Sequence, residues 1–258
     1  MEIQELALSL VQQFSVFYGE GSPEMKRQAE LTIEQIIQSP LFPQCYLSIL
    51  QMDTSPVVLF GVLTCMKNVI GTRASQITED LKPIRDATLQ YLLERPNTYT
   101  NVLRAGSALI ARVVKVTWAK DMRERTLLKD MAPFFEGSLF CQKAGLEIMT
   151  EVVVEMNQFI PSVETKSSHR PSSATFRETI HLPLAQRVFP LLPRAEEAER
   201  LPPERISVTT SALGLLTALL SADYGGSGEG AGEEAEMAML PSEWAPLAGS
   251  PALVTQLA

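Results

Sequence analysis

Few residues in this sequence have the type and spacing that catalysis or metal binding requires. The histidines His169 and His181 have no second histidine or cysteine at the spacing of a metal-ligand pair. The cysteines Cys45, Cys65 and Cys141 lie far apart in apolar segments, which is typical of small buried side chains in a reducing compartment. No paired base or nucleophile elbow accompanies a cysteine or a serine. The sequence therefore predicts no catalytic residue and no metal site.

The glycine-rich stretch 222–238 is the only segment that could suggest a nucleotide-binding loop. Such a loop needs the spacing Gly-x-Gly-x-x-Gly between a strand and a helix. Starting from Gly226 and Gly228, the third glycine position holds Ala231, and starting one pair later it holds Glu233. No strand pattern precedes the stretch, and its four glutamates would repel a phosphate. We interpret it as a linker and expect no cofactor.

Composition narrows the classes of partner. The chain has 258 residues, of which 45% are hydrophobic and 20% charged, and its formal net charge is -8. It has no basic stripe of the kind that nucleic-acid binding needs, and no apolar run of the roughly 20 residues that cross a membrane. The amino-terminal segment lacks the basic start of a signal peptide. We expect a soluble intracellular protein with no nucleic-acid partner and no membrane insertion, whose acidic surface is either merely solvated or meets a basic partner.

Apolar residues recur with the period of an α-helix along most of the chain. In residues 2–18, spacings of three and four place one set of side chains on a single face: Ile3, Leu6, Leu10, Phe14 and Phe17. In residues 138–159, a fourfold spacing marks another stripe: Phe140, Ala144, Ile148, Val152 and Met156. The Ser-Pro and Thr signals at Ser22, Ser55 and Thr78 predict helix starts.

The predicted helices come in pairs with a period of about 40 residues, as in HEAT-like repeats. The pairs are 2–18 with 23–38, 41–52 with 56–71, 78–94 with 99–118, 123–136 with 138–159, and 174–192 with 204–221. One pair cannot bury both of its faces, whereas stacked neighbours can. We therefore predict an all-α fold, an α-α superhelix of the HEAT-like or armadillo type with a concave side. A compact all-helical bundle is the alternative, because short turns between antiparallel helices serve both.

Changes in composition along the chain also predict how it is divided into segments. Residues 1–160 are predicted to hold four helix pairs, followed by a polar loop at 161–173 and a fifth pair at 174–221. Residues 222–242 are predicted to be a flexible acidic insert, because a segment rich in glycine and glutamate buries too little apolar surface to fold. Residues 243–258 begin a new apolar pattern, which we interpret as the start of a further repeat that is cut short.

Several motifs carry a family resemblance. The stretch from Arg27 to Pro40, with its Ala-Glu, spaced aliphatic residues and Ser-Pro, resembles the first repeat of importin-beta-like transport receptors. Further motifs, in collinear order, resemble the exportin seven type and its paralogue Ran-binding protein seventeen: Leu63-Thr-Cys-Met-Lys67, Ile84-Arg-Asp86, Tyr91-Leu-Leu-Glu-Arg-Pro96, Ala111-Arg-Val-Val-Lys-Val-Thr-Trp118, Glu155-Met-Asn-Gln158, Phe176-Arg177 and Pro241-Ser-Glu-Trp244. The sequence departs from the family in its insert, which is Gly- and Glu-rich where the family's is Ser- and Asp-rich, and in its length, since family members are several times longer.

The resemblance implies a nuclear transport receptor and not an enzyme. It implies that the amino-terminal repeats bind the GTPase Ran in its GTP form, that protein cargo is carried through the nuclear pore between nucleus and cytoplasm, and that the outer face contacts phenylalanine-glycine nucleoporins. The second helix of each pair, at 23–38, 56–71, 99–118 and 138–159, would face Ran.

The candidate contacts that follow from this resemblance are Lys67, Arg104, Arg112 and Lys115. For Arg112 and Lys115, a salt bridge within the repeat and a solvated helix end remain alternatives, and Trp118 is expected to be a core anchor between the third and fourth pairs. Two other functions stay open: a HEAT-type structural or assembly scaffold that does not bind Ran, and a helical enzyme, which would need a polar pocket with shifted ionisable groups.

Overall fold

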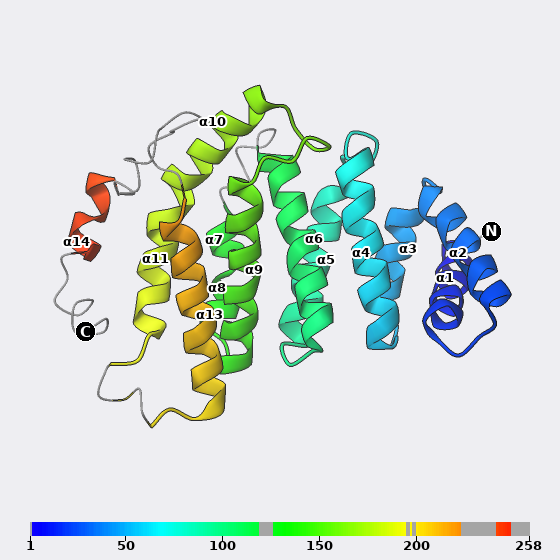
Figure 1. The fold of residues 1–258 in the computed structure, drawn as a ribbon, viewed down its shortest axis with the longest axis horizontal. Coiled ribbons are helices and arrows are strands. Elements are labelled where there is room, and N and C mark those ends of the chain that lie inside the picture. The colour runs from blue at the N-terminus through cyan, green and yellow to red at the C-terminus, as the bar shows by residue number, and fades with distance from the viewer. Residues whose placement is uncertain (1, 119–125, 195–196, 198–199, 223–240, 249–258) are drawn as a thin grey trace. The chain divides into compact units, whose positions relative to one another are not determined.

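Helices form wherever the apolar period of the sequence predicts them. The computed structural model describes residues 2–118, 126–194, 197, 200–222 and 241–248, and within these ranges every regular element is a helix or a helical turn. The chain divides into two compact units, Met1–Val116 and Thr117–Ala258. The predicted all-α helical-repeat fold of the solenoid class is confirmed (Figure 1).

The first unit contains three helix pairs. Their bounds are α1 Ile3–Tyr18 and α2 Pro23–Gln38, α3 Phe42–Leu50 and α4 Pro56–Arg73, and α5 Leu81–Glu94 and α6 Thr100–Trp118, of which the last two residues fall in the second unit. Ser22 and Ser55 accept hydrogen bonds from Met25 and Val58, and a proline occupies the first turn of both helices, as predicted. The predicted start at Thr78 is wrong, since α5 begins at Leu81 and the Thr78 hydroxyl donates to the carbonyl of Ala74.

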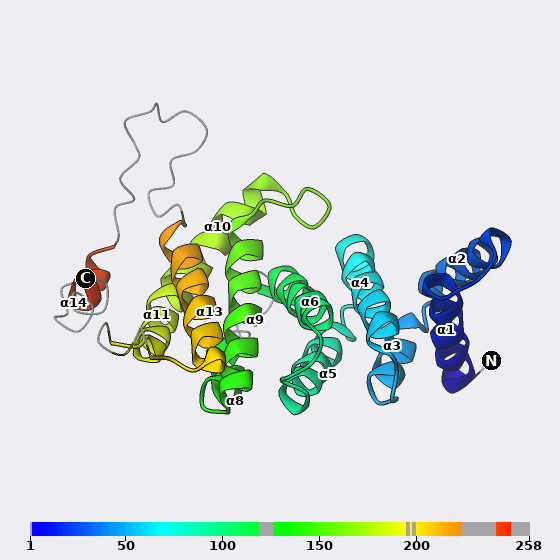
Figure 2. The same ribbon diagram turned by 60° about the horizontal axis from the view of Figure 1, so that its bottom comes forward.

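The helices of the first unit form two layers (Figure 2). The first helices of the pairs pack side by side, α1 on α3 and α3 on α5, and the second helices do the same, with α2 on α4. The guanidinium of Arg73 on α4 donates to the carbonyls of Ile37 and Gln38 at 3.3 and 3.0 Å, and so satisfies acceptors at the end of α2 that the helix itself leaves open. This bond fixes one second helix against the next.

A glycine sets the distance between α1 and α4. A Cβ atom at Gly61 would lie 2.7 Å from the ring of Phe14, closer than any non-bonded carbon contact allows. Phe14 is 3% exposed and belongs to the predicted apolar face of α1. Because Gly61 has no side chain, the aromatic ring lies directly on the backbone of α4 and closes the core between the first two pairs.

A buried polar contact fixes α3 against α5. The hydroxyls of Tyr46 and Thr88 are 2.6 Å apart, and both residues are fully buried. Thr88 donates its only hydroxyl proton to the carbonyl of Ile84 at 2.6 Å, so the Tyr46 hydroxyl must be the donor to Thr88. Burial raises the pKa of Tyr46 far above its usual value, which keeps the phenol protonated and able to donate.

The second unit is built around two long helices, α9 Leu139–Asn157 and α13 Pro203–Leu220, which pack along each other (Figure 1). The short helices α7 Leu127–Asp130 and α8 Ala132–Phe135 precede α9 and fall within the predicted helix 123–136. The stripe predicted on α9 is confirmed at Ala144, Ile148, Val152 and Met156, which are at most 1% exposed, whereas Phe140 is 41% exposed.

The predicted polar loop is shorter than expected, because α10 Lys166–Phe176 begins within it. Thr165 and Ser168 form a capping box that starts the helix. Near its other end, the guanidinium of Arg177 donates to Ser173 at 2.7 Å and to Asn157 of α9 at 3.3 Å. The polar composition of this segment concealed the helix, since contacts with α9 stabilise it and an apolar stripe of its own does not.

One continuous helical path leads from α10 to the end of the fifth pair's first helix. A π-helical turn, η2 Arg177–His181, joins α10 to α11 Leu182–Val188, and the 3-10 turn η3 Phe189–Leu191 ends the path. Pro183 stands at the second position of α11, where it offers no N–H, and the π turn changes the hydrogen-bond register immediately before it. Pro183 is therefore accommodated by a wider helical turn immediately before it.

Most of the predicted acidic insert, 222–242, lies outside the described residues, as does most of the segment 243–258. What is described there is the 3-10 turn η4 Ser242–Trp244 and the short helix α14 Ala245–Ala248. Trp244 is 5% exposed, so the apolar pattern that begins at this residue does contribute a buried side chain to the second unit.

His181 is a buried titratable group in the π turn. Its side chain is fully buried, and the ring meets Phe176 edge to face at a centroid distance of 5.5 Å. Burial, and secondarily the positive charge of Arg177, lower the pKa of His181 to about 3. The imidazole is therefore neutral in the folded protein across the physiological range.

The Tyr46–Thr88 contact predicts an asymmetric pair of variants. We expect Thr88→Val to lower the free energy of unfolding by about 1 to 3 kcal/mol, because it leaves the Tyr46 hydroxyl buried without its acceptor, and Tyr46→Phe to lower it by only about 1 kcal/mol. Urea denaturation of both variants and of the double variant measures this. The matched control is Thr210→Val, since exposed Thr210 makes the same bond to the carbonyl four residues before it. Equal losses at positions 88 and 210 would contradict the account.

The buried imidazole predicts a loss of stability in mild acid. An unfolded chain binds a proton at His181 near the ordinary pKa of about 6.5, whereas the folded chain does so only near 3. The stabilisation is thus complete above pH 6.5 and declines as the pH falls toward 3. Linkage gives a loss of about 2 kcal/mol from this group between pH 7 and pH 5. Urea unfolding at the two pH values should show this loss in the wild type and not in His181→Gln, and an equal decline in both would exclude His181 as the cause.

Candidate functional site

The described residues offer no constellation for chemistry. No group of three or more His, Cys, Asp or Glu side chains in the described ranges could hold a metal ion. Burial raises the pKa of Cys65 to about 11 and also raises that of Cys45, so both thiols stay protonated and are poor nucleophiles. Among the helices that the structure describes, none is both long and apolar enough to cross a membrane. The surfaces of the two helix layers are therefore the candidate sites.

The second-helix layer of the first unit carries the four predicted contact residues. Lys67 lies on α4, and the other three lie on α6. On a helix with 3.6 residues per turn, Arg104, Arg112 and Lys115 fall within about 80° of one another, so they share one side of α6. The burial of these three side chains also depends on their position along the helix.

The four predicted contact residues differ in how much of each side chain is exposed to solvent. Arg104, near the start of α6, is exposed, and Lys67 and Arg112 are half-buried. Lys115 is only 5% exposed, because the last two turns of α6 are enclosed on nearly every side. Lys115 lies inside the protein, away from any surface that a macromolecular partner could reach without a rearrangement.

The side chain of Arg112 extends from α6 to α4. A Cβ atom built at Gly71 of α4 would lie 2.6 Å from Nη1 of Arg112, so the guanidinium rests on the bare backbone of that glycine. Lys67 stands four residues before Gly71, one helical turn away on the same side of α4 and roughly 6 Å along its axis. The structure thus places the guanidinium of Arg112 on α4, one helical turn from the position of Lys67.

Trp118, at the end of α6, is 7% exposed and meets Phe176 of α10 edge to face at a centroid distance of 5.0 Å. It is a core residue, as the sequence indicated. The aromatic partner belongs to the fifth predicted pair, beyond the fourth pair that sequence order suggested. Phe176 follows the segment mistaken for a loop, which explains why this contact could not be predicted.

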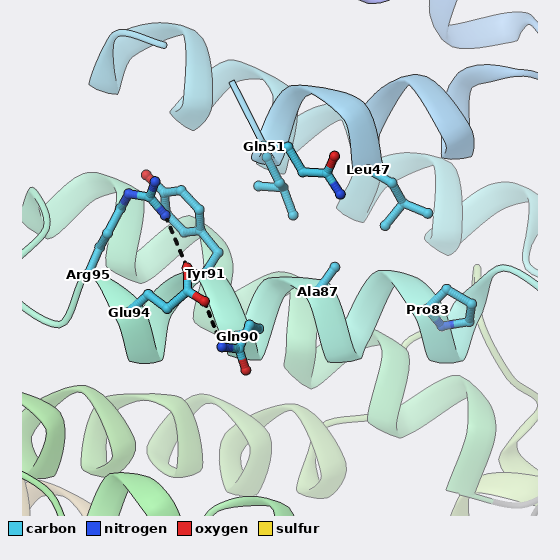
Figure 3. Close-up of a pocket in the computed structure, with 9 residues that line it drawn as sticks. Leu47, Gln51, Pro83, Ala87, Gln90, Tyr91, Glu94 and Arg95 are labelled. Carbon is cyan, nitrogen blue, oxygen red and sulfur yellow. Dashed lines mark hydrogen bonds and ion pairs between the residues drawn. The ribbon is translucent and has the colours of Figure 1, made fainter. Parts of the chain in front are cut away.

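The first-helix layer has a groove between α3 and α5, with a volume of about 540 Å³ (Figure 3). Its apolar lining comes from both helices, and its polar lining gathers toward the end of α5. The residues are Leu47, Leu50, Gln51, Pro83, Ala87, Gln90, Tyr91, Glu94 and Arg95. The Tyr46–Thr88 contact joins α3 to α5, the two helices that form the walls of the groove.

The polar end of this groove is held in place by its own contacts. The guanidinium of Arg95 lies over the ring of Tyr91, 4.7 Å from its centroid, and its Nη1 atom is 3.6 Å from Glu94. Gln90 donates to Glu94 at 2.7 Å. Three of these residues belong to the motif Tyr91-Leu-Leu-Glu-Arg-Pro96, which marked the family without suggesting a site. Only the packing of α3 onto α5 makes them part of a groove.

Paired helices stacked in two layers, with a groove on one layer and cations on the other, define a helical-repeat binding scaffold. Ran-binding protein 16 of Drosophila melanogaster is 27% identical to this chain over 165 residues, which is 62% of this chain and 14% of that protein. Exportin-7-B and Exportin-7-A of Xenopus laevis are each 23% identical over 168 residues, or 63% of this chain and 15% of each relative. No established protein-family profile matches the chain.

These relatives confirm the resemblance that the motifs indicated: the chain is homologous to Ran-binding protein 16 and to the exportin-7 proteins over part of its length. The names of these relatives are those of Ran-binding and export proteins, and none of the three names an enzyme. The match spans only 14 to 15% of the length of these relatives. What the whole relatives bind or carry is therefore a proposal for this chain.

Proposed function

We propose that this chain binds Ran in its GTP form through the second-helix layer of its first unit. The observation that carries the proposal is that the guanidinium of Arg112 on α6 reaches the backbone of α4, one helical turn from Lys67, on a chain whose net charge is -8. Charge-assisted hydrogen bonds from such a pair suit an acidic partner surface. One relative is named Ran-binding protein 16, and this name supplies the partner.

The wider role that we propose is nucleocytoplasmic transport of protein cargo, with the chain moving between nucleus and cytoplasm through the nuclear pore. The support for it is the homology to proteins named exportins. A partner that binds one arrangement of the stacked pairs better than another would change the affinity for a second partner by linkage, which is how a scaffold without catalysis can release cargo.

The alternative is a HEAT-type structural or assembly scaffold that does not bind Ran. The first experiment measures binding of the 258-residue chain to Ran loaded with a non-hydrolysable GTP analogue, beside Ran loaded with GDP. We expect a clear preference for the GTP form. A folded, helical sample that binds neither form, or both equally, would favour the structural scaffold.

Charge reversal tests which cations make the contact. We expect Lys67→Glu and Arg112→Glu each to weaken the binding of GTP-loaded Ran by roughly tenfold or more, because each replaces a charge-assisted bond by a repulsion. Isothermal titration calorimetry measures the affinities. Lys115→Glu is unsuitable, since it would bury a carboxylate at a position that is 5% exposed.

The matched control for charge reversal is Lys82→Glu. It makes the same change in net charge within the first unit, but on α5 of the first-helix layer, where the Lys82 side chain is 69% exposed. An equal loss of affinity in Lys82→Glu would mean that only the overall charge matters, and the proposed contact surface would be wrong.

We also propose that the groove between α3 and α5 binds the phenylalanine side chain of phenylalanine-glycine nucleoporins. The groove lies on the first-helix layer, away from the proposed Ran surface, and combines apolar walls with the amides of Gln51 and Gln90, which could pair with an extended peptide backbone.

A peptide titration tests the groove. We expect Leu47→Ala to weaken the binding of a phenylalanine-glycine peptide about fivefold, because part of the apolar wall is lost. Chemical-shift changes on titration measure this weak binding, with a serine-glycine peptide as the blank. Leu31→Ala is the matched control, since Leu31 lies on α2 of the second-helix layer and is 46% exposed. Equal effects of the two variants would contradict the assignment.

A further inference from the structure

One position that the sequence did not single out controls where a proposed contact residue lies. Gly71, in the last turn of α4, has no side chain of its own, and the Nη1 and Cζ atoms of Arg112 would lie 2.6 and 3.8 Å from a Cβ atom built there. Nothing larger than hydrogen fits at this point while the guanidinium keeps its place. The location of the Arg112 charge therefore depends on the residue type at position 71.

We propose that Gly71 is a positioning residue for the Ran-binding surface, acting through Arg112. The inference rests on the proposed function and deepens it. With glycine at position 71, the guanidinium lies on the backbone of α4, one helical turn from Lys67, so that two cations from different helices face one acidic patch of the partner. A methyl group at this position displaces the guanidinium from the backbone of α4 and so changes where this charge meets the partner.

The geometry indicates that Gly71→Ala would move the Arg112 side chain without changing the fold. The atom that a methyl group at position 71 would displace is the far end of a long, flexible side chain, which can rotate away without moving either helix backbone. Alanine also favours a helix more than glycine does. Gly71→Ala should therefore keep the fold and its thermal stability while changing where one charge stands, and this separates it from Gly61→Ala, where the obstacle is the buried ring of Phe14.

A double-mutant cycle tests the proposal. The affinity for Ran loaded with a non-hydrolysable GTP analogue is measured by calorimetry for the 258-residue wild type, Gly71→Ala, Arg112→Ala and the double variant. We expect Gly71→Ala alone to weaken binding by roughly fivefold to tenfold. In the Arg112→Ala background, Gly71→Ala should have no further effect, because the side chain that it displaces is absent.

The controls separate positioning from loss of structure. Gly214→Ala makes the same exchange at an exposed position of α13, where a Cβ atom would meet nothing within 4 Å, and should leave binding unchanged. Thermal unfolding should show Gly71→Ala to be at least as stable as the wild type.

Three results would overturn the proposal. If Gly71→Ala has no effect in the wild-type background, or weakens binding equally in both backgrounds, Gly71 does not act through Arg112, while the proposed function stands. If the wild type itself shows no preference for the GTP form of Ran, the proposed function fails and the inference fails with it.

Discussion

A single pair of short helices has two apolar faces and can cover only one of them with its own side chains. Every other feature of this protein depends on that constraint, because each pair must lie against a neighbour to remain folded. The first unit meets it by packing first helices on first helices and second helices on second helices. Two layers with different exposed surfaces result, and the candidate sites lie on these surfaces because no group of metal-ligating side chains was found among the described residues.

Glycines, which have no side chain, allow close contacts between the helices. Gly61 admits the ring of Phe14 against α4, and Gly71 admits the guanidinium of Arg112 to the same helix. Polar groups then fix the register, as Tyr46 does with Thr88 and Arg73 with the end of α2. Many other packings of the same helices could bury the same apolar area. The observed stack is therefore defined in addition by a few close contacts and by polar groups that have hydrogen-bond partners.

Most of the fold could be predicted from the sequence, because apolar period and capping residues act locally. The helices at Pro23, Pro56 and Leu139 begin where their serine caps are. The failures have a common origin in contacts that lie far apart along the chain. Helix α10 has little apolar character of its own and is held by Arg177, Ser173 and Asn157, and the partner of Trp118 lies beyond the neighbouring pair.

The candidate site was predictable only in part, for the same reason. The family resemblance named Arg104, Arg112 and Lys115 as candidates, yet it could not show that Lys115 is buried, because burial depends on neighbouring elements. The spacing of residues in the sequence could not reveal the groove either. Its walls come from two helices, α3 and α5, and in the sequence its lining residues look like those of any helix surface. The only sequence signal for Gly71 was the presence of a glycine inside a helix. Its role could not be inferred without the structure, which shows that the side chain of Arg112 lies on it.

The close approach of Phe14 to Gly61 has a consequence for sequence divergence. A relative can accept a larger residue at position 61 only if position 14 shrinks at the same time or α1 moves outward. The two positions are thus bound to change together during evolution, although they belong to different helix pairs and lie far apart in the chain. Their joint variation across homologues would record the spacing of the first two helix pairs even where little else of the sequence is shared.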